Sequence, residues 1–469
     1  MKTYSRYAWV LAAALALSGC TVGPRYVQPG TPPIELASPQ TAQLVAGQAG
    51  TMPADWWTFF EDEGLTRWIE AALAYNHDIR RAQANLLTAR AVLDERRLDR
   101  LPGVTSGVGY TRGIRQQPDT NGRSARTLSE SWQAGFDVQW EIDLFGRMNR
   151  LSQAAMARAE AGQADLELAR LSIAAEVART WFEAQGLRRQ RRVAAQETAN
   201  WRETVRLAEA NARAGAGLPE DLENARANLQ RSESAIPPLA AALQQAHYRL
   251  DVLAGQRPGK GLAEPGELPA EALALQLPLG DVDRLIRHRP DVARAERLLA
   301  ASVEDVGAAT ADLYPRLNLG GFLGFFALRG GDFGNAASRA FSLAPVLDWP
   351  ALRLGNARAR LRGAEALSQG ARAVYEQSLL RAQEDVENAV TRLVEHQHHL
   401  ASLLQSARHA QAAFEIADKR YRAGAGSYQA VLENQRTLFQ LKQQIAQSET
   451  NSWLHAVALY KALGWRGKS

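Results

Sequence analysis

Cys20 has the clearest chemistry in the chain, because it is the only cysteine and follows the small residues Ser18 and Gly19. Residues 8–17 form an apolar stretch, too short for a bilayer that needs ~20 residues, and small residues between such a stretch and a cysteine are typical of a lipoprotein signal peptide. We expect 1–19 to be removed and Cys20 to carry a covalent lipid, with no other cofactor. The alternative is an ordinary buried cysteine after a cleaved signal peptide.

Three histidines, His396, His398 and His399, stand together in a region of helical composition. His396 and His399 are three apart, a spacing that places two potential metal ligands on one helix face. No carboxylate or cysteine completes a site at a ligand spacing nearby. We therefore predict a solvated helix face and no bound metal.

Two function classes find no support in the sequence. No Gly-x-Ser-x-Gly elbow, phosphate-binding glycine loop or Ser/His/Asp order stands out, so we do not expect an enzyme. Charge is nearly balanced, with 55 basic and 50 acidic side chains, and no basic stripe is interleaved with aromatic residues. Nucleic acid is therefore not an expected partner.

The elements that position these residues occur twice. The second half repeats the proline- and glycine-containing motifs of the first half in the same order. Leu101-Pro102 is matched by Tyr314-Pro315, and Arg213-Ala214-Gly215-Ala216-Gly217 by Arg422-Ala423-Gly424-Ala425-Gly426. Such self-similarity predicts two copies of one structural unit.

Each copy contains one very long helix. No proline occurs between Arg147 and Arg213, so a helix of 67 residues is predicted there, about 100 Å long at ~1.5 Å per residue. The stretch 355–422 repeats it. A helix of this length needs partners along its whole length, and 219–254 and 428–463 are predicted to return against the two long helices.

Each copy also contains a predicted β-hairpin, at about 103–140 and 316–348, where apolar and aromatic residues alternate with small or polar ones. This alternation suits strands whose two faces meet different solvents. Four strands are too few for a membrane barrel, which needs at least ~8. Three copies would supply twelve strands and twelve helical rods. The predicted fold is therefore mainly α with a small β part: a homotrimeric α-barrel of coiled-coil helices continuous with a 12-stranded transmembrane β-barrel, four strands per chain, with an internal two-fold sequence repeat.

The predicted domain organisation follows this repeat. It comprises the signal peptide 1–19, an extended segment 20–63, a first repeat 64–255, a linker 256–280, a second repeat 281–464 and a tail 465–469.

Several segments together resemble the TolC-like outer-membrane efflux proteins, in particular their OprM/NodT-like lipoprotein branch. The matching segments are Leu17 to Tyr26, Trp56-Trp57 with Phe60, Asn76 with Asp78, Trp140-Glu141-Ile142-Asp143-Leu144-Phe145-Gly146-Arg147, Arg289-Pro290-Asp291, Tyr314-Pro315 and Arg420-Tyr421-Arg422-Ala423-Gly424. The resemblance covers essentially the whole mature chain.

The resemblance implies a homotrimeric channel in the outer membrane of a Gram-negative bacterium, extending into the periplasm. It implies docking to a periplasmic adaptor protein and an inner-membrane RND-type transporter, with passive, gated export of drugs or other small toxic compounds. The alternatives are an exit duct for type I protein secretion or for metal efflux, and a structural periplasmic lipoprotein coiled coil without a pore.

The turns that end the long helices are the expected tip of this channel. Gly215, Gly217, Gly424 and Gly426 supply the permissive backbone that a helix C-terminus needs, so their predicted role is structural.

The resemblance also implies acidic residues just after these turns. Asp221 and Glu433 are the candidates, with Glu220 as a competing assignment, and three copies would form acidic rings that attract cations. A solvated helix face near the tip is the alternative. Tyr421, Arg422 and Arg213 are candidates for the inter-helix bonds that hold the tip closed.

Overall fold

The computed structural model describes residues 21–30, 55–118, 124–215, 217–261 and 282–464. Cys20 and the signal peptide 1–19, most of the linker 256–280 and the tail 465–469 lie outside the described residues.

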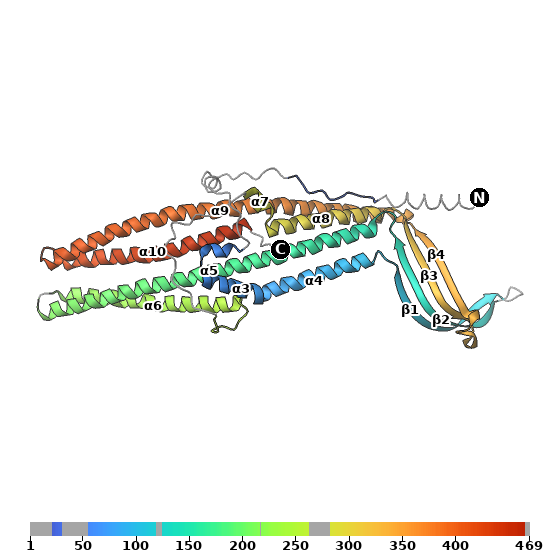
Figure 1. Cartoon of the computed structure of the whole chain (residues 1–469), viewed down its shortest axis with the longest axis horizontal. Helices are drawn as coiled ribbons and strands as arrows, with labels where there is room; N and C mark the ends of the chain where they lie inside the picture. Colours follow the sequence, from blue (N-terminus) through green and yellow to red (C-terminus); the bar gives the residue numbers. More distant parts are fainter. Residues whose placement is uncertain (1–20, 31–54, 119–123, 216, 262–281, 465–469) are drawn as a thin grey trace. The chain divides into compact units, whose positions relative to one another are not determined.

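Helices dominate the described chain (Figure 1). They are α3 (Glu63–Tyr75), α4 (His77–Leu98), α5 (Arg147–Arg213), α6 (Pro219–Leu253), α7 (Val282–Arg287), α8 (Pro290–Ala311), α9 (Leu354–Arg422) and α10 (Tyr428–Leu463), with short 3-10 helices at Trp56–Phe60, Gly330–Asp332, Ala336–Ser338 and Ala351–Arg353. The strands are β1 (Gly103–Pro118), β2 (Ser124–Ile142), β3 (Arg316–Ala327) and β4 (Arg339–Asp348). The prediction of a mainly α chain with four strands is confirmed.

The chain divides into two compact units, each built from both sequence repeats. The sheet unit comprises the described residues within Met1–Gly30, Asn85–Gln163 and Arg294–Tyr375. The helical unit comprises those within Thr31–Ala84, Ala164–Ala293 and Glu376–Ser469. None of the described helices is long and apolar enough to cross a membrane.

The sheet unit holds one antiparallel sheet in the order β1-β2-β3-β4. Directly opposed residues of antiparallel strands share a face, and Phe136 opposes Leu323, which opposes Phe341. This face carries large exposed apolar side chains, namely Val104, Val108, Phe136, Leu323, Phe341 and Leu343. The other face carries mostly small or polar residues such as Thr105, Asp137 and Ser342. The two faces are therefore suited to different solvents.

The two repeats meet in this sheet where Gly135 opposes Gly324. A Cβ at Gly324 would lie 2.2 Å from the backbone oxygen of Ala134 and 2.5 Å from the Cα of Gly135. Backbone atoms cannot swing away as a side chain does, so the β2–β3 pairing requires glycine at this position.

Matching tryptophans fix the strand ends to the preceding helices. The indole N–H of Trp140 donates to the backbone oxygen of Arg100, 3.0 Å away, and that of Trp349 donates to Leu313, 3.2 Å away. The sequence repeat thus reappears as the same hydrogen bond after α4 and after α8.

An aromatic cluster forms the core of the helical unit. Trp56 stacks on Tyr460 and Phe182 stacks on Trp453, while Phe60 packs edge-on against all four of these rings. Pairs in such geometries contribute about 0.5–1.5 kcal/mol beyond their buried area. Trp56, Trp57 and Trp453 are all buried, so their role is in packing.

Each repeat also closes its helices through one equivalent hydrogen bond. Asn76 caps α4 and donates from Nδ2 to the backbone oxygen of Leu253, at 2.9 Å. In the second repeat Arg289 donates to the backbone oxygen of Ala462, at 2.6 Å, and also pairs with Asp291. The structure therefore gives the Arg289-Pro290-Asp291 segment a role in joining α8 to the end of α10.

Candidate functional site

The predicted tip consists of two helix reversals in the helical unit, from α5 to α6 and from α9 to α10 (Figure 1). Gly215 has a φ of 68° and Gly424 a φ of 73°, the left-handed conformation that ends a helix and that glycine adopts without strain. A Cβ at Gly217 would lie 3.2 Å from the Asn211 Cβ, and one at Gly426 would lie 3.2 Å from the Arg420 Cβ. The two turns are therefore built alike.

A cluster of polar and aromatic side chains joins the two hairpins near these turns. Asn211 of α5 donates from Nδ2 to the Tyr421 hydroxyl of α9, 3.1 Å away. The Tyr421 ring lies 5.2 Å from that of Tyr428, whose hydroxyl donates to the backbone oxygen of Thr204 at 3.3 Å. Tyr421, one of the residues predicted at the tip, therefore connects the α5–α6 hairpin to the α9–α10 hairpin within one chain.

Asp221 lies close enough to act on this cluster. Burial raises the pKa of Tyr428 to about 12, and Tyr421 and the Asp221 carboxylate add to the shift by disfavouring a phenolate. Asp221 is half-buried at the start of α6. The structure thus brings together two of the predicted residues, Asp221 and Tyr421, through Tyr428.

We expect Tyr428 to titrate well above an ordinary tyrosine. The folded tip holds this proton more tightly than an unfolded chain, whose tyrosines titrate at 10.0, so the Tyr428 contribution to stability is complete below pH 10 and is lost between pH 10 and about 12. The measurement is the phenolate absorbance as a function of pH, taken for wild type and for Tyr428→Phe. The difference between the two curves should show one group titrating near pH 12. A difference curve centred at 10 would contradict the burial argument, and Asp221→Asn should lower the midpoint.

The two predicted arginines bind partners on their own helices. Arg422 pairs with Asp418 at 2.9 Å, and Arg213 approaches Glu209 at 3.7 Å. Glu209 also pairs with Arg226 of α6 at 3.0 Å, so the link between α5 and α6 comes from Arg226. Within the chain as described, neither Arg213 nor Arg422 forms an ion pair with the other hairpin.

Glu433 and Glu220 are exposed on their helices. Glu433 accepts a long hydrogen bond of 3.4 Å from Gln429, one turn earlier in α10. Its neighbours differ from those of Asp221, so the two predicted acidic positions are not equivalent in environment.

Sequence reasoning missed a polar ladder along α5. Gln190, Glu197 and Asn211 bond Gln447, Gln443 and Tyr421 through their side chains, at 2.9, 2.8 and 3.1 Å. Thr204 lies seven residues after Glu197 and seven before Asn211, and its backbone oxygen accepts from Tyr428 at 3.3 Å. A seven-residue spacing keeps side chains on one seam of paired helices. Polar residues at this spacing in the predicted helix were the available signal. Hydrogen bonds therefore contribute to the seam between hairpins, each by a net ~0.5–1.5 kcal/mol, together with the Arg189–Glu449 ion pair at 2.7 Å.

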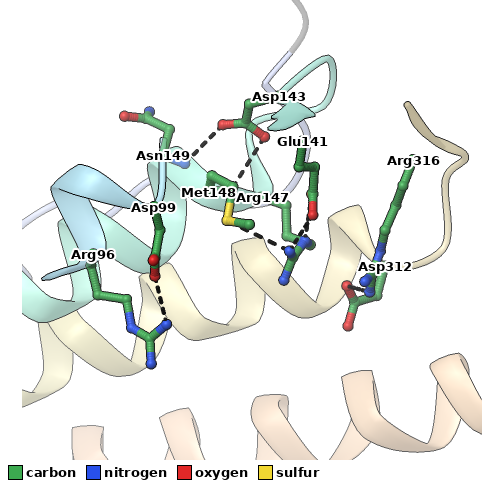
Figure 2. A network of polar contacts seen from close by, with 9 residues as sticks. All are labelled: Arg96, Asp99, Glu141, Asp143, Arg147, Met148, Asn149, Asp312 and Arg316. Carbon is green, nitrogen blue, oxygen red and sulfur yellow. Dashed lines mark hydrogen bonds and ion pairs between the residues drawn. The ribbon is translucent and has the colours of Figure 1, made fainter. Parts of the chain in front are cut away.

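A second network lies in the sheet unit, where β2 turns into α5 (Figure 2). Arg147 donates to both carboxylate oxygens of Glu141, at 2.9 and 2.6 Å. Asp143 accepts from the backbone N–H groups of Met148 and Asn149 and so caps α5. The Trp140–Arg147 segment therefore fixes the direction in which the long helix leaves the sheet.

The histidine prediction requires correction at one residue. His396 is half-buried, with Nε2 2.8 Å from the backbone oxygen of Ser448 and its ring 4.9 Å from that of His455. It therefore faces α10, because the two antiparallel helices pack there, whereas His398 and His399 are exposed. In the described part of the chain, no three His, Cys, Asp or Glu side chains are arranged to hold a metal ion.

Comparisons with known proteins agree with this architecture. Residues 68–256 and 282–465 match the family described as "Outer membrane efflux protein", one match for each repeat. The solvent efflux pump outer membrane protein SrpC of Pseudomonas putida is 28% identical over 462 residues, 96% of this chain and 96% of the relative. The cation efflux system protein CusC of Escherichia coli K12 is 28% identical over 460 residues, 96% of this chain and 97% of the relative.

Among solved structures, the outer-membrane channel OprN superposes with a TM-score of 0.89 at 37% identity, covering 95% of this chain and 99% of that chain. The family match spans more than half of the sequence and includes both repeats. The chain therefore belongs to the outer membrane efflux protein family, and it is a bacterial outer-membrane efflux channel that extends into the periplasm, not an enzyme.

Proposed function

We propose that three copies of this chain form a passive, gated duct that exports drugs or other small toxic compounds to the cell exterior. The observation that carries the proposal is the sheet, whose apolar face is exposed along its whole width. Among the described strands, β1 and β4 each pair along one edge only. Exposed apolar area is unfavourable unless lipid covers it. Unpaired strand edges are unfavourable unless further strands pair with them.

The helices of the sheet unit support closure by copies of the same chain. Packing of Leu93 against Ala155 links α4 to α5, the Arg150–Glu304 pair links α5 to α8, and Ser302 bonds Ser368 to link α8 to α9. The outer members of this series, α4 and α9, adjoin the edge strands β1 and β4 in sequence. One seam between copies would therefore join both strands and helices, giving a barrel of twelve strands.

Light scattering of the purified protein in detergent tests the assembly. The proposal expects three times the mass of one chain, together with a β signal in circular dichroism that resists heating. A monodisperse monomer that retains the full β signal would argue for a structural coiled coil without a pore.

The proposed partners are a periplasmic adaptor protein and an inner-membrane RND-type transporter, which would supply the energy that a passive duct lacks. The support is the family membership and the names of relatives that belong to efflux pumps and systems. Co-purification tests these partners. An adaptor expressed from the same organism should co-purify with the intact channel and not with a variant in which the tip is deleted.

We further propose that Asp221 and Glu433 line the periplasmic entrance, and that Tyr421 helps to hold it closed. Acidic rings from three copies attract cations and repel anions. Asp221→Asn with Glu433→Gln should therefore lower the cation-to-anion permeability ratio severalfold in single-channel recordings. Glu220→Gln, an exposed acidic neighbour of Asp221, is the matched control and should change the ratio less. Unchanged selectivity in the double variant would remove Asp221 and Glu433 from the pathway.

The cargo has two candidates. Relatives named for solvent efflux and for cation efflux are equally similar, at 28% identity, and the second supports metal export as the alternative. If the cargo is organic compounds, expression in a host that lacks its own outer-membrane duct should restore resistance to organic toxicants. Restored resistance to toxic metal cations alone would favour the second.

A further inference from the structure

The N-terminal segment Thr21–Gly30 lies against α5 and α8 in the sheet unit. The Val22 N–H donates to the backbone oxygen of Phe145 at 3.2 Å, and a Cβ at Gly146 would lie 2.6 Å from the Thr21 side chain. Thr21 directly follows Cys20 in the sequence. The predicted lipid is thus attached one residue from a contact with the end of the sheet.

One face of α9 can be identified as the face nearest to the N-terminal segment. The Tyr26 hydroxyl donates to Glu296, and burial and this bond raise the pKa of Tyr26, with a further contribution from the Tyr375 phenol of α9. Tyr375 is itself 3% exposed. The face of α9 that bears Tyr375 therefore lies toward Tyr26 of the N-terminal segment.

The start of α9 carries an unusual charge. Arg353, which ends the 3-10 helix before α9, and Arg358, Arg360 and Arg362 in the first turns of α9 are all exposed, and none of them pairs with a carboxylate of the described residues. The first turn of α9 contains no acidic residue. Positive side chains at the positive end of a helix dipole are unfavourable, so an external anion would relieve this arrangement.

Two of these arginines lie on the face of Tyr375. At ~100° per residue, Arg360 is about 60° from Tyr375 around α9, whereas Arg358 and Arg362 are about 100° and 140° away on the other side. Arg353 directly precedes α9 and, if the same spacing is continued by one residue, falls about 40° from Tyr375 on the side of Arg360. Arg353 and Arg360 are seven residues apart, about 10 Å along the axis at ~1.5 Å per residue. They form one stripe next to the sheet.

This stripe lies at the edge of the apolar sheet face. Asp348 at the end of β4 opposes Arg316 at the start of β3, and Trp349, which is half-exposed, follows directly. Interfacial tryptophans mark the headgroup level of membrane strands. Long arginine side chains reach from below this level to phosphate groups.

We propose that Arg353 and Arg360 form a binding site for the phosphate groups of anionic phospholipids in the adjoining membrane leaflet. This site rests on the proposed duct, because it requires the sheet to cross a membrane. The site would help to fix the depth of the channel in the bilayer, because the attraction between arginine and phosphate would add to the burial of the apolar sheet face in lipid.

Native mass spectrometry of the purified wild-type assembly, titrated with phosphatidylglycerol or phosphatidylcholine, tests the site. An arginine near an anionic surface strengthens binding by roughly fivefold, so wild type should bind phosphatidylglycerol at least roughly fivefold more tightly than phosphatidylcholine. Arg353→Gln with Arg360→Gln should abolish this preference. Arg358→Gln with Arg362→Gln, with the same charge change at the same level, should retain it.

Three outcomes would overturn the site: no preference in wild type, retention of the preference in the 353/360 variant, or equal loss in both double variants. Competition by inorganic phosphate at equal concentration would overturn the assignment to a lipid source. Conductance of the same samples in planar bilayers separates this inference from the duct, because conducting channels without lipid preference contradict only the site. Absence of current in every variant would count against the duct instead.

Discussion

Replacement of Gly324 by alanine is expected to disrupt the sheet. The new Cβ would lie 2.2 Å from the Ala134 oxygen and 2.5 Å from the Gly135 Cα, both backbone atoms. The β2 and β3 strands would have to separate, and they are the pair that joins the two repeats in the sheet. Overpacking with no room for relaxation costs about 3 kcal/mol or more, so the variant should lose the heat-resistant β signal and the trimer.

Gly320→Ala is the matched control for this change. Gly320 lies on the same strand and the same face, but a Cβ there would meet its nearest neighbour, the Ala344 oxygen, at an ordinary 3.6 Å. It should leave circular dichroism and mass unchanged. If Gly324→Ala behaves like Gly320→Ala, the close approach of β2 and β3 is not required for assembly.

Loss of the Arg150 guanidinium is expected to have the largest effect among the ion pairs of the sheet unit. Arg150 is 3% exposed and contacts Glu304, 10% exposed, at 2.7 Å. It also donates to the backbone oxygens of Val22 and Gly23. Arg150→Met leaves a buried carboxylate without compensation, which costs about 3–5 kcal/mol, and should lower the thermal or urea midpoint strongly.

The neighbouring pair supplies the control. Arg158 lies eight residues beyond Arg150 on α5, and Asp305 directly follows Glu304 on α8, but the two side chains are 49% and 34% exposed, so Arg158→Met should cost less than about 1 kcal/mol. Adding Glu304→Met to Arg150→Met should recover much of the loss. Equal, small effects of Arg150→Met and Arg158→Met would show that burial does not govern this pair.

The helices and hairpins could be predicted because their signals are local. The absence of proline over 67 residues predicts 147–213, and the helix observed is Arg147–Arg213. Alternating side chains predict the hairpin at 316–348, and the strands observed there run from Arg316 to Asp348. Long repeated patterns of this kind are set by backbone chemistry and periodicity, which the sequence displays directly.

The contacts between elements could not be predicted in the same way. Asn211 meets Tyr421 across 210 positions of sequence, and Tyr26 meets Glu296 across 270. Which residues face each other depends on the rotation and register of packed helices, which a single sequence does not fix. The same limit explains His396, whose half-burial comes from α10 and not from its own helix.

The glycines illustrate both situations. Gly215 and Gly424 could be assigned as helix ends from their position after a long helical stretch, and both have positive φ. Gly135 and Gly324 have no such local signal, because their requirement arises only when two strands pair. The roles of Asp221, Glu433, Tyr421, Arg422, Glu220 and Arg213 in gating remain predictions.

Single-channel recording of the purified, lipidated trimer in planar bilayers tests the central claim most directly. A gated duct predicts discrete, small conductances that are closed most of the time in wild type. It also predicts that Asn211→Ala with Tyr421→Phe, which removes the 3.1 Å hydrogen bond between hairpins, increases the open fraction. No current from either correctly folded trimer would contradict the account and favour a structural lipoprotein.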